Sequence, residues 1–458
     1  MQDWLSNKFA VNAANVKSLA INIVLVTNAF VWYYFAIDLL KSIVQTAQIN
    51  QSTVLLVWVL HFAGIGFSAL IGALFSKKVK DKSCFILVWM ILGVIASLCT
   101  FLLNLSNVPS ILLLSLLFGV SLGLGMPSCM GYFSESIAVE KRGRVAGIIF
   151  LLSGLIMVGL GSISGGDIGL QTIILSSWRM SGLVIFVSFF LSSPHQKKLE
   201  KYESIAYKSL LSQRQFLLYL VPWTLFSLIT YLTVPLQMNI IQNMQANSVK
   251  ILSADYLLGI ENILIAASAV FCGFLADIVG RKRMSIVGFA LLGIGYSFLG
   301  IYPESPLSWY FYTVIDGVSL GILFVIFIIT IWADLSNGSP SEKYYAVGVL
   351  PFFISYLLKL TTGPEIVAAI PPTSIFSFTA LFLFLAVLPL VYAPETLPEK
   401  IMKDRELRSY LEKAQKIAQK EMKNQKQEKK EPQKKTGESQ EENTEEYIEA
   451  QKLSEKYY

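Results

Sequence analysis

Two carboxylates stand inside long apolar runs of this sequence. Asp316 lies in the run 309–332 and Glu261 lies in the run 253–275. A charged side chain in an apolar helix is costly, so an ionisable residue at such a position is a candidate functional group. We expect these two acids to bind a proton or a substrate.

Other polar side chains fall within similar runs. Asp38 and Lys359 lie near the ends of their runs, where snorkelling toward water is the preferred interpretation. For His61 we favour a hydrogen bond between helices. Hydroxyl and amide groups near mid-depth suit sugars or other polar metabolites, although contacts between helices use such groups equally well. They belong to Asn28, Tyr33, Tyr231, Ser121, Ser227 and Ser319.

A short charged link, GFLADIVGRKR, joins two apolar runs at residues 273–283. Gly280 can supply the tight turn that so short a link between antiparallel helices needs, and Gly273 lets helices approach closely. Asp277 suits a neighbouring helix N-terminus, where unpaired N–H groups favour an anion. The alternative is a basic loop that only sets the topology.

The composition predicts a membrane protein around these residues. Of 458 residues, 54% are hydrophobic and 15% are charged, whereas soluble domains average about 25% charged. A bilayer core of about 30 Å needs about 20 helical residues. Twelve runs are long enough and do not alternate like β-barrel strands, so we expect an all-α membrane protein. The runs are 18–40, 53–75, 84–105, 108–133, 145–163, 177–193, 216–240, 253–275, 284–301, 309–332, 345–363 and 374–393.

The sixth run has the least certain start, since QTIILSSWRM fits either the span or a re-entrant loop. Lysine and arginine concentrate in every second link between the runs, namely SKKVKDKS, 141–144, 194–215 and 281–283. By the positive-inside rule, these links and both termini are cytoplasmic. We therefore expect a multi-pass protein of the plasma membrane.

The two halves of the sequence resemble each other. FGVSLGLG at 118–125 matches DGVSLGIL at 316–323, and the segment from Gly72 matches the one from Gly273, at offsets of 198 and 201 residues. Repeats with an even number of spans predict two parallel bundles around a cavity whose access alternates. The expected parts are an N-terminal six-helix bundle (1–193), a cytoplasmic loop (194–215), a C-terminal six-helix bundle (216–397) and a charged tail (398–458), part helical and part disordered.

Several motifs resemble those of the major facilitator superfamily. The link at 273–283 is similar to its loop signature G-x-x-x-D-x-x-G-R-R/K, and Glu135-x₆-Arg142-Gly143 is similar to its sugar-porter pattern E-x₆-R-G. Pro394-Glu395-Thr396 resembles its P-E-T, and Trp178-Arg179 resembles a pair that precedes helix 6. The resemblance covers residues 1–400 and is nearest to the sugar porters and metabolite–proton symporters.

The resemblance implies two pseudo-symmetric six-helix bundles and a conformational latch between them. Asp277 should face the start of helix 5 near Arg144, and Glu135 with Arg142 should add a second polar clasp. The first-half copy of the loop has Ser76 where an acid is expected, so that part of the latch should be weaker. The implied latch residues are Gly273, Asp277, Gly280, Arg281, Glu135, Arg142 and Arg144.

Departures from the family pattern leave the solute and the coupling open. Helix 7 lacks the Gln-Gln pair of sugar porters, and residues 31–34 read VWYY where metabolite–proton symporters have EWYD. We expect a secondary active or facilitative transporter for a small polar solute, a sugar or an organic metabolite, with proton coupling undecided. The alternatives are multidrug-type efflux and a transport-dead membrane sensor or scaffold that signals through its tail.

The sequence also indicates what the protein works with. It has no G-x-x-x-x-G-K-[ST] motif, which argues against an ATP-driven pump. We expect a monomer that is not an enzyme, in contact with a small solute, the lipid bilayer and, for coupled transport, protons. No nucleic acid, metal or cofactor is expected, and the tail is a candidate site for a protein partner.

Overall fold

A computed structural model describes residues 2–76, 82–192, 205–246, 251–361 and 370–397, together with 407, 411, 414, 416 and 417. The side chains of 2–15, 190–192, 230–232 and 255 lie outside that description. Contacts divide the chain into two units, Met1–Thr396 and Leu397–Tyr458. The apolar runs belong to the first unit. Most of the predicted tail, including its disordered stretch, lies outside the described residues.

The described part of the chain contains twelve helical segments that are long and apolar enough to cross a membrane, as the sequence predicts. They are α1 (Gln2–Thr46), α2 (Gln51–Phe75), α3 (Lys82–Leu102), α4 (Val108–Ser136), α5 (Arg142–Ser164), α6 (Ile168–Ser192), α8 (Arg214–Ala246), α9 (Ala254–Val279), α10 (Arg281–Ile301), α11 (Pro306–Phe324) continued by η2 (Val325–Thr330) and α12 (Ile331–Leu335), α13 (Glu342–Gly348) with α14 (Leu350–Thr361), and α16 (Pro372–Tyr392).

The sixth span is better defined than its sequence suggested. Residues 171–180 lie within α6, so QTIILSSWRM belongs to the span and not to a re-entrant loop. The pair Trp178-Arg179 consequently lies in the middle of that helix, which corrects its expected place before helix 6.

Two spans are interrupted for identifiable reasons. The span from Glu342 to Thr361 breaks between α13 and α14, where Pro351 has no N–H to donate and crowds the preceding turn. The stretch η2 is a wider π-helix. Side-chain donors satisfy carbonyls of that stretch, because Trp332 Nε1 donates to Phe327 O at 2.5 Å and Thr330 Oγ1 donates to Ile326 O at 3.2 Å.

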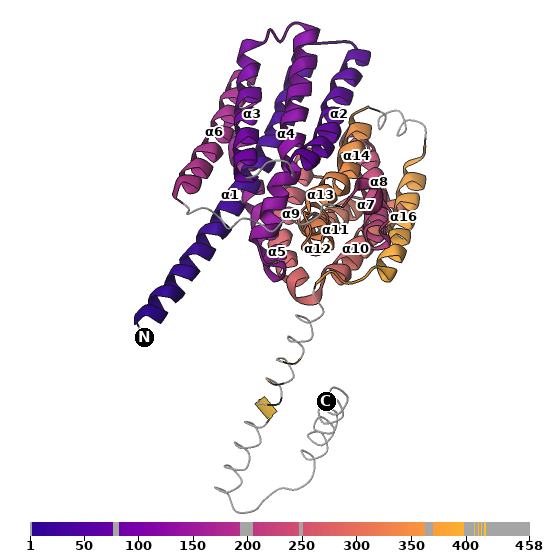
Figure 1. Ribbon diagram of the computed structural model, residues 1–458. Helices are drawn as coiled ribbons and strands as arrows, with labels where there is room; N and C mark the ends of the chain where they lie inside the picture. The colour runs from indigo at the N-terminus through magenta and orange to yellow at the C-terminus, as the bar shows by residue number, and fades with distance from the viewer. Residues whose placement is uncertain are drawn as a thin grey trace, which may run out of the picture. The chain divides into compact units, whose positions relative to one another are not determined.

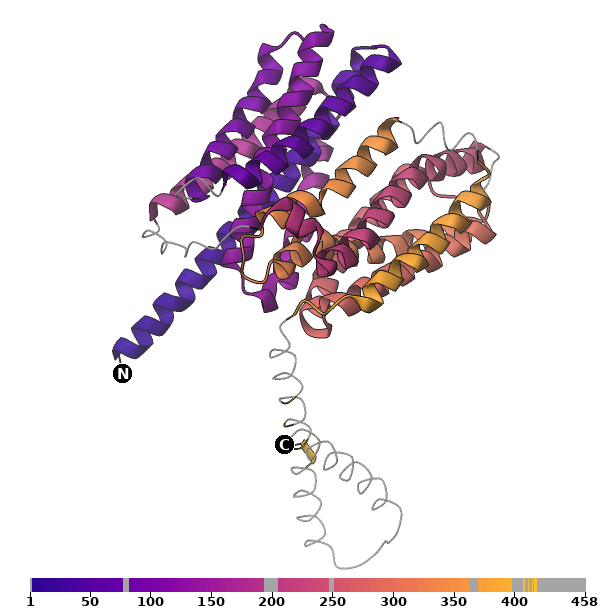
Figure 2. The ribbon, with the colours of Figure 1, turned by 45° about the vertical axis from the view of Figure 1, so that its right-hand side comes forward.

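Helices from the two halves of the chain gather on different sides of the first unit. Figures 1 and 2 show α2, α3, α4 and α6 together, and α8, α10 and α16 together. Between these groups α5 packs against α9, and α14 packs against α2. Contacts do not divide the unit further, so the expected bundle boundaries near 193 and 216 stay predictions.

The outer faces of the helices carry large apolar side chains. Phe67 on α2, Val88 on α3, Leu155 on α5 and Phe378 on α16 are each at least 60% exposed. A continuous apolar exterior of this kind is unstable in water but matches the hydrocarbon core of a bilayer.

The contact between α2 and α4 depends on glycine at close approach. A Cβ at Gly123 would clash with Ile65 O and with Ser68 Oγ. Neither atom can move far, because the carbonyl belongs to the helix backbone and Ser68 is buried. The absence of a side chain at Gly123 therefore sets the distance between these helices.

We predict that Gly123→Ala lowers the stability of the protein by about 1–3 kcal/mol, since an added methyl overpacks this contact. Gly159→Ala is the matched control, because a Cβ there meets no atom within 4 Å. Thermal unfolding of the purified variants in detergent measures the difference. Equal midpoints for the two variants would contradict the close-approach interpretation.

Candidate functional site

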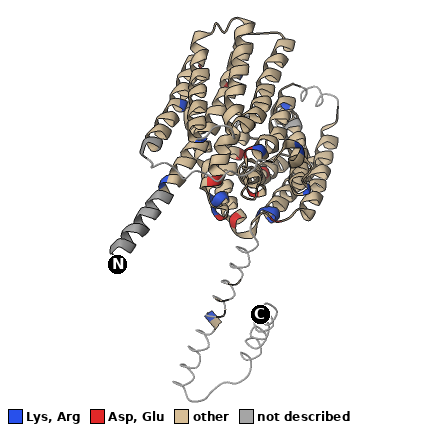
Figure 3. Ribbon diagram, viewed as in Figure 1, with Lys and Arg blue, Asp and Glu red and all other residues tan. Residues whose placement is uncertain are grey.

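Acidic and basic side chains from several spans meet at one end of the helices, here called the charged end. It comprises the end of α2 with the start of α3, the end of α4 with the start of α5, the α9–α10 link, and the region from α12 to α13. Figure 3 shows acidic and basic residues together where α5, α9 and α12 meet. Charges buried away from water need partners, so their pairing indicates what this end does.

Asp277 caps the start of α5. Its Oδ1 accepts the N–H of Gly143 at 2.9 Å, and its Oδ2 accepts the N–H and the Nε–H of Arg144 at 2.9 and 3.1 Å. The carboxylate is fully buried and lies at the positive end of the α5 dipole. This is the contact between the two halves that the sequence predicts. Gly273 lies beside it, and a Cβ there would clash with Gly143 O.

A chain of ion pairs extends from Asp277 across the charged end. Arg281 lies 2.8 Å from Asp277 and 3.1 Å from Asp334. Arg142 donates to the other oxygen of Asp334 at 2.7 Å. With Arg144 these five residues form a continuous series of base, acid, base, acid and base, which we call the Asp277 latch. It joins α5 to α9, α10 and α12.

Glu135 and Arg142 do not act together as the expected second polar clasp, because each pairs with a different residue. Arg142 points into the interface toward Asp334, whereas Glu135, near the end of α4, pairs with Lys82 at the start of α3. Lys82 also lies 2.5 Å from Glu342 at the start of α13. Both implied latch residues are therefore at the charged end, with partners other than those expected.

Gly280 and Glu395 shape the link between α9 and α10. Gly280 has a φ of 115°, which favours glycine, and a Cβ there would clash with the Glu395 carboxylate. Glu395 accepts the N–H groups of Arg281 at 2.8 Å and Lys282 at 3.2 Å, and so caps α10. Glu395 lies in the P-E-T motif that the sequence pointed to without assigning it a role.

Sequence reasoning missed three charged residues of this end: Asp334, Lys82 and Glu342. Asp334 could have been found, because it is the repeat counterpart of Glu135 at an offset of 199 residues. The roles of Lys82 and Glu342 could not have been predicted from the sequence, because they depend on which helix ends meet across the interface.

The central link adds a further contact through α7 (Tyr207–Leu211). Tyr207 donates to Leu70 O at 2.7 Å, and Lys343 donates to Ile205 O at 2.7 Å. Burial raises the pKa of Tyr207 to about 12, so its hydroxyl stays protonated even in moderately alkaline solution. This link therefore ties α2 to the start of α13.

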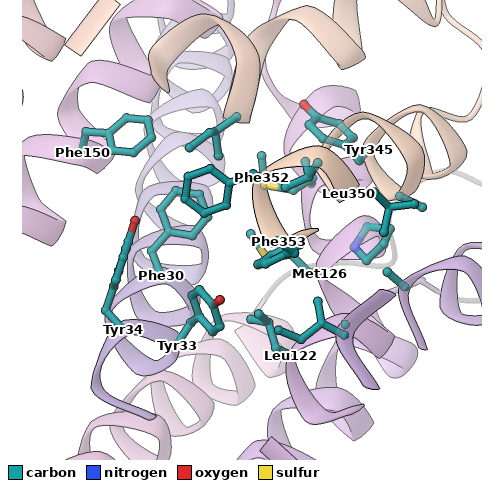
Figure 4. A pocket seen from close by; sticks show the side chains of 18 residues that line it. Phe30, Tyr33, Tyr34, Leu122, Met126, Phe150, Tyr345, Leu350, Phe352 and Phe353 are labelled. Carbon is teal, nitrogen blue, oxygen red and sulfur yellow. The ribbon is translucent and has the colours of Figure 1, made fainter. Parts of the chain in front are cut away.

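A cavity of about 70 Å³ lies between helices of the two halves (Figure 4). Its walls are almost entirely apolar and come from α1, α2, α4, α5, η2, α13 and α14. Hydroxyl groups in the lining belong to three tyrosines, Tyr33, Tyr34 and Tyr345. Tyr345 donates to Ile329 O, whereas the buried hydroxyl of Tyr33 has no hydrogen-bond partner among the described residues. The other lining residues are Phe30, Ile65, Ala69, Leu122, Gly123, Met126, Pro127, Met130, Phe150, Ile328, Ala346, Val349, Leu350, Phe352 and Phe353.

Among the polar side chains expected at mid-depth that the structure describes, only Tyr33 lines this cavity. Asn28 is used between α1 and α6, where it donates to Trp178 O at 2.7 Å and accepts from Arg179 at 2.9 Å. The Arg179 guanidinium lies over the rings of Trp32 and Trp89, at 5.3 and 4.3 Å from their centroids. Asn28 therefore holds a buried arginine in place.

The remaining candidates whose side chains the structure describes lie outside the cavity lining. His61 Nδ1 is 3.1 Å from Ser115 O on α4, which is the interhelical contact expected of it. The side chain of Tyr231 lies outside the described residues, although its backbone is part of α8. Ser121, Ser227 and Ser319 are buried in the helix bundle.

Asp38 and Lys359 lie at the end of the helices opposite the charged end. Asp38 is 56% exposed and pairs with Lys41 at 3.3 Å. Lys41 also donates to the Tyr356 hydroxyl at 3.2 Å, and Lys359 lies 5.3 Å from the centroid of the same ring. Tyr356 therefore joins α1 and α14 at this end. Each of the two helices contributes one lysine to the contact, Lys41 from α1 and Lys359 from α14.

Asp316 and Glu261 come together within the second half. The two side chains are within hydrogen-bonding reach of each other, although they lie on different helices, α11 and α9. Asp316 is 3% exposed, and its Oδ1 has no hydrogen-bond partner among the described residues. Tyr312 lies one turn before Asp316 on α11, where its hydroxyl donates to Tyr296 at 3.1 Å and accepts from Gln237 at 2.9 Å. This polar cluster is separate from the apolar cavity.

The family model of the Major Facilitator Superfamily matches residues 21–254, which is more than half of the 458 residues. Together with the twelve helices, this match shows that the chain belongs to the Major Facilitator Superfamily and is a multi-pass membrane transporter in the general sense. No curated protein matches the sequence. The match is to the superfamily as a whole and does not extend to its sugar-porter branch.

We predict that Asp277→Asn opens the charged end. The neutral amide removes the negative charge that now pairs with both Arg144 and Arg281. Removing one partner of a buried pair typically costs 3–5 kcal/mol, so the closed-to-open ratio should fall at least about tenfold. The measurement is the labelling rate of a reporter cysteine that replaces Ala73, in a protein without its native cysteines. Ala73 lies on α2, packs near Ala346 of α13 and is 4% exposed.

Asp167→Asn is the matched control for this prediction. Asp167 also caps a helix, accepting Leu170 N–H at 2.6 Å, but it is exposed. Its variant should label as the parent does. Equal labelling rates for the Asp277 and Asp167 variants would show that the Asp277 latch does not hold this end closed.

Proposed function

We propose that this protein carries a small organic solute through the apolar cavity by alternating access. The observation that carries the proposal is the position of the cavity. Helices of both halves line it, and buried ion pairs between the same halves close the charged end. Exposing the cavity at that end requires the Asp277 latch to break.

We propose further that the charged end faces the cytoplasm of a cell whose plasma membrane holds the protein. Basic links at Lys82, Arg142–Arg144 and Arg281–Arg283 support this orientation, because positively charged links stay on the cytoplasmic side. In this arrangement the latch closes the cytoplasmic side, and a solute would meet the cavity from outside.

The cavity lining supports a solute with an apolar or aromatic body and few polar groups. A sugar carries many hydroxyl groups, each of which loses free energy when buried without a hydrogen-bond partner. The described lining offers three tyrosine hydroxyls, and that of Tyr345 already donates to Ile329 O. Within the polar-solute expectation we therefore favour an organic metabolite over a sugar. Multidrug-type efflux is the second candidate, because flexible apolar walls with Met126 and Met130 suit varied ligands.

We predict that Phe353→Ala weakens binding of such a solute about tenfold, since the variant loses part of the apolar wall. Tyr33→Phe should change the affinity much less, because the rest of the ring stays. The measurement is the ligand-induced rise in the melting temperature of the purified protein, screened against sugars, organic acids, amino acids and lipophilic cations, followed by counterflow in proteoliposomes.

The opposite pattern would indicate a different solute class. If a sugar stabilises the protein, and Tyr33→Phe abolishes the effect while Phe353→Ala leaves it intact, the solute is polar and the apolar-body proposal is wrong. Saturable binding without any flux, together with a partner that requires the tail, would instead support the sensor or scaffold function.

Glu261 and Asp316 support proton coupling. Two neighbouring carboxylates repel each other, so a proton on one of the two carboxyl groups relieves that repulsion. The pair could therefore take up and release one proton as the surroundings of α9 and α11 change. Lys359 is close enough to Glu261 to interact with it electrostatically.

We predict that Asp316→Asn and Glu261→Gln each remove the pH dependence of uptake, because neither amide can exchange the shared proton. Uptake into proteoliposomes with and without an imposed pH gradient measures this. Asp38→Asn, which alters an acid that is 56% exposed, should keep the dependence. If the Asp316→Asn and Glu261→Gln variants both keep pH-dependent uptake, the carboxyl pair is not the coupling site.

A further inference from the structure

The link between α2 and α3 is the first-half copy of the charged link at 273–283. It lacks the acid of that link but still contacts the opposite half of the chain. Ser76 occupies the position that corresponds to Asp277, at an offset of 201 residues. Repeat symmetry alone would leave this side of the interface weakly held. Yet Ser76 is 2% exposed, and its hydroxyl lies 3.5 Å from the carboxylate of Glu342 in the second half.

Glu342 is buried at the start of α13. It is 4% exposed, and its side chain lies against α4, where a Cβ at Gly131 would be only 3.0 Å away. A carboxylate at such a position requires a cation or strong donors. Lys82 supplies the cation at 2.5 Å, and it also pairs with Glu135.

A neighbouring contact fastens the same two helices. Ser134 on α4 and Ser341, which precedes α13, share a hydrogen bond of 2.7 Å between their hydroxyls. Both hydroxyls are buried. The start of α13 is therefore held to α4 by a neutral contact and to α3 by an ionic one.

We propose that Glu342 supplies, from the opposite half, the acid that the first-half link lacks. Ser76, Lys82 and Glu135 of the first half and Glu342 of the second half form what we call the Glu342 latch. Its polarity is the reverse of the Asp277 latch. In the Asp277 latch the acid belongs to the link, and the first half contributes the start of α5. In the Glu342 latch the acid belongs to the start of α13, and the first half contributes the base Lys82.

This assignment rests on the alternating access proposed above, and it reverses the expectation for one substitution. Restoring an acid by Ser76→Asp looks like a repair when only the repeat is considered. In the structure the new carboxylate would lie next to that of Glu342, which is 3.5 Å from the Ser76 hydroxyl that the substitution replaces. Like charges in a buried interface repel, so the substitution should open the charged end.

The test uses the cysteine reporter at Ala73 and compares variants of equal size. Ser76→Asp should label at least about tenfold faster than Ser76→Asn, which differs from it only in charge. Glu342→Gln alone should also speed labelling, because Lys82 and Glu135 are left without the contact across the interface. In the double variant Ser76→Asp, Glu342→Gln the acid has moved to the other side of the contact, and labelling should return to within about threefold of Ser76→Asn.

Each other result overturns the proposal. If Ser76→Asp labels no faster than Ser76→Asn, or if Glu342→Gln leaves the rate unchanged, Glu342 does not hold this side closed. Size-exclusion profiles and melting temperatures show whether a variant is folded, and Asp277→Asn shows that the reporter detects opening. Failure of transport is a separate result, since labelling of the detergent-purified protein requires no solute or flux.

Discussion

The structure depends on burying charges between helices that must also separate. In the Asp277 latch, two carboxylates and three guanidinium groups meet where α5, α9, α10 and α12 converge. Arg144 is partly exposed, but none of the other four charges could remain buried alone, because the desolvation penalty of an unpaired ion exceeds what local packing can offset. Water must reach these groups when they part, so closing and opening exchange ion pairs for hydration. That exchange can keep the two states close in free energy.

One segment of the chain connects the latches to the cavity. Residues 325–350 include Asp334 and Glu342, which pair at the charged end, and Ile328, Tyr345 and Ala346, which line the cavity. Tyr345 donates to Ile329 O, so α13 is tied to the π-helical stretch η2. A wide helical turn and a proline-associated break allow this segment to change shape more easily than an uninterrupted helix.

Much of this architecture could be predicted from the sequence, because it follows from length and hydropathy. Twelve apolar runs give twelve helices. The contact of Asp277 with α5 follows from the family resemblance and the repeat, together with the affinity of helix starts for anions. The cavity lining could not be predicted in this way. An apolar residue such as Phe353 has the same pattern whether it faces lipid, the helix core or a cavity. The sequence left Asn28 open between a solute site and a contact between helices, because its partner Arg179 is 151 residues away.

The position of the cavity beside the latches bears on how a solute could drive the switch. A ligand shifts a conformational equilibrium only if it binds the two states with different affinity. A pocket lined by one rigid half would bind equally in both states and would leave the equilibrium unchanged. Here α1 and α4 supply one wall, while η2, α13 and α14 supply the other. When Asp334 and Glu342 leave their partners, the wall carried by the same segment must move relative to α1 and α4. The apolar contacts made by a bound solute then change with the state of the ion pairs, which is the physical requirement for coupling the solute to the latch.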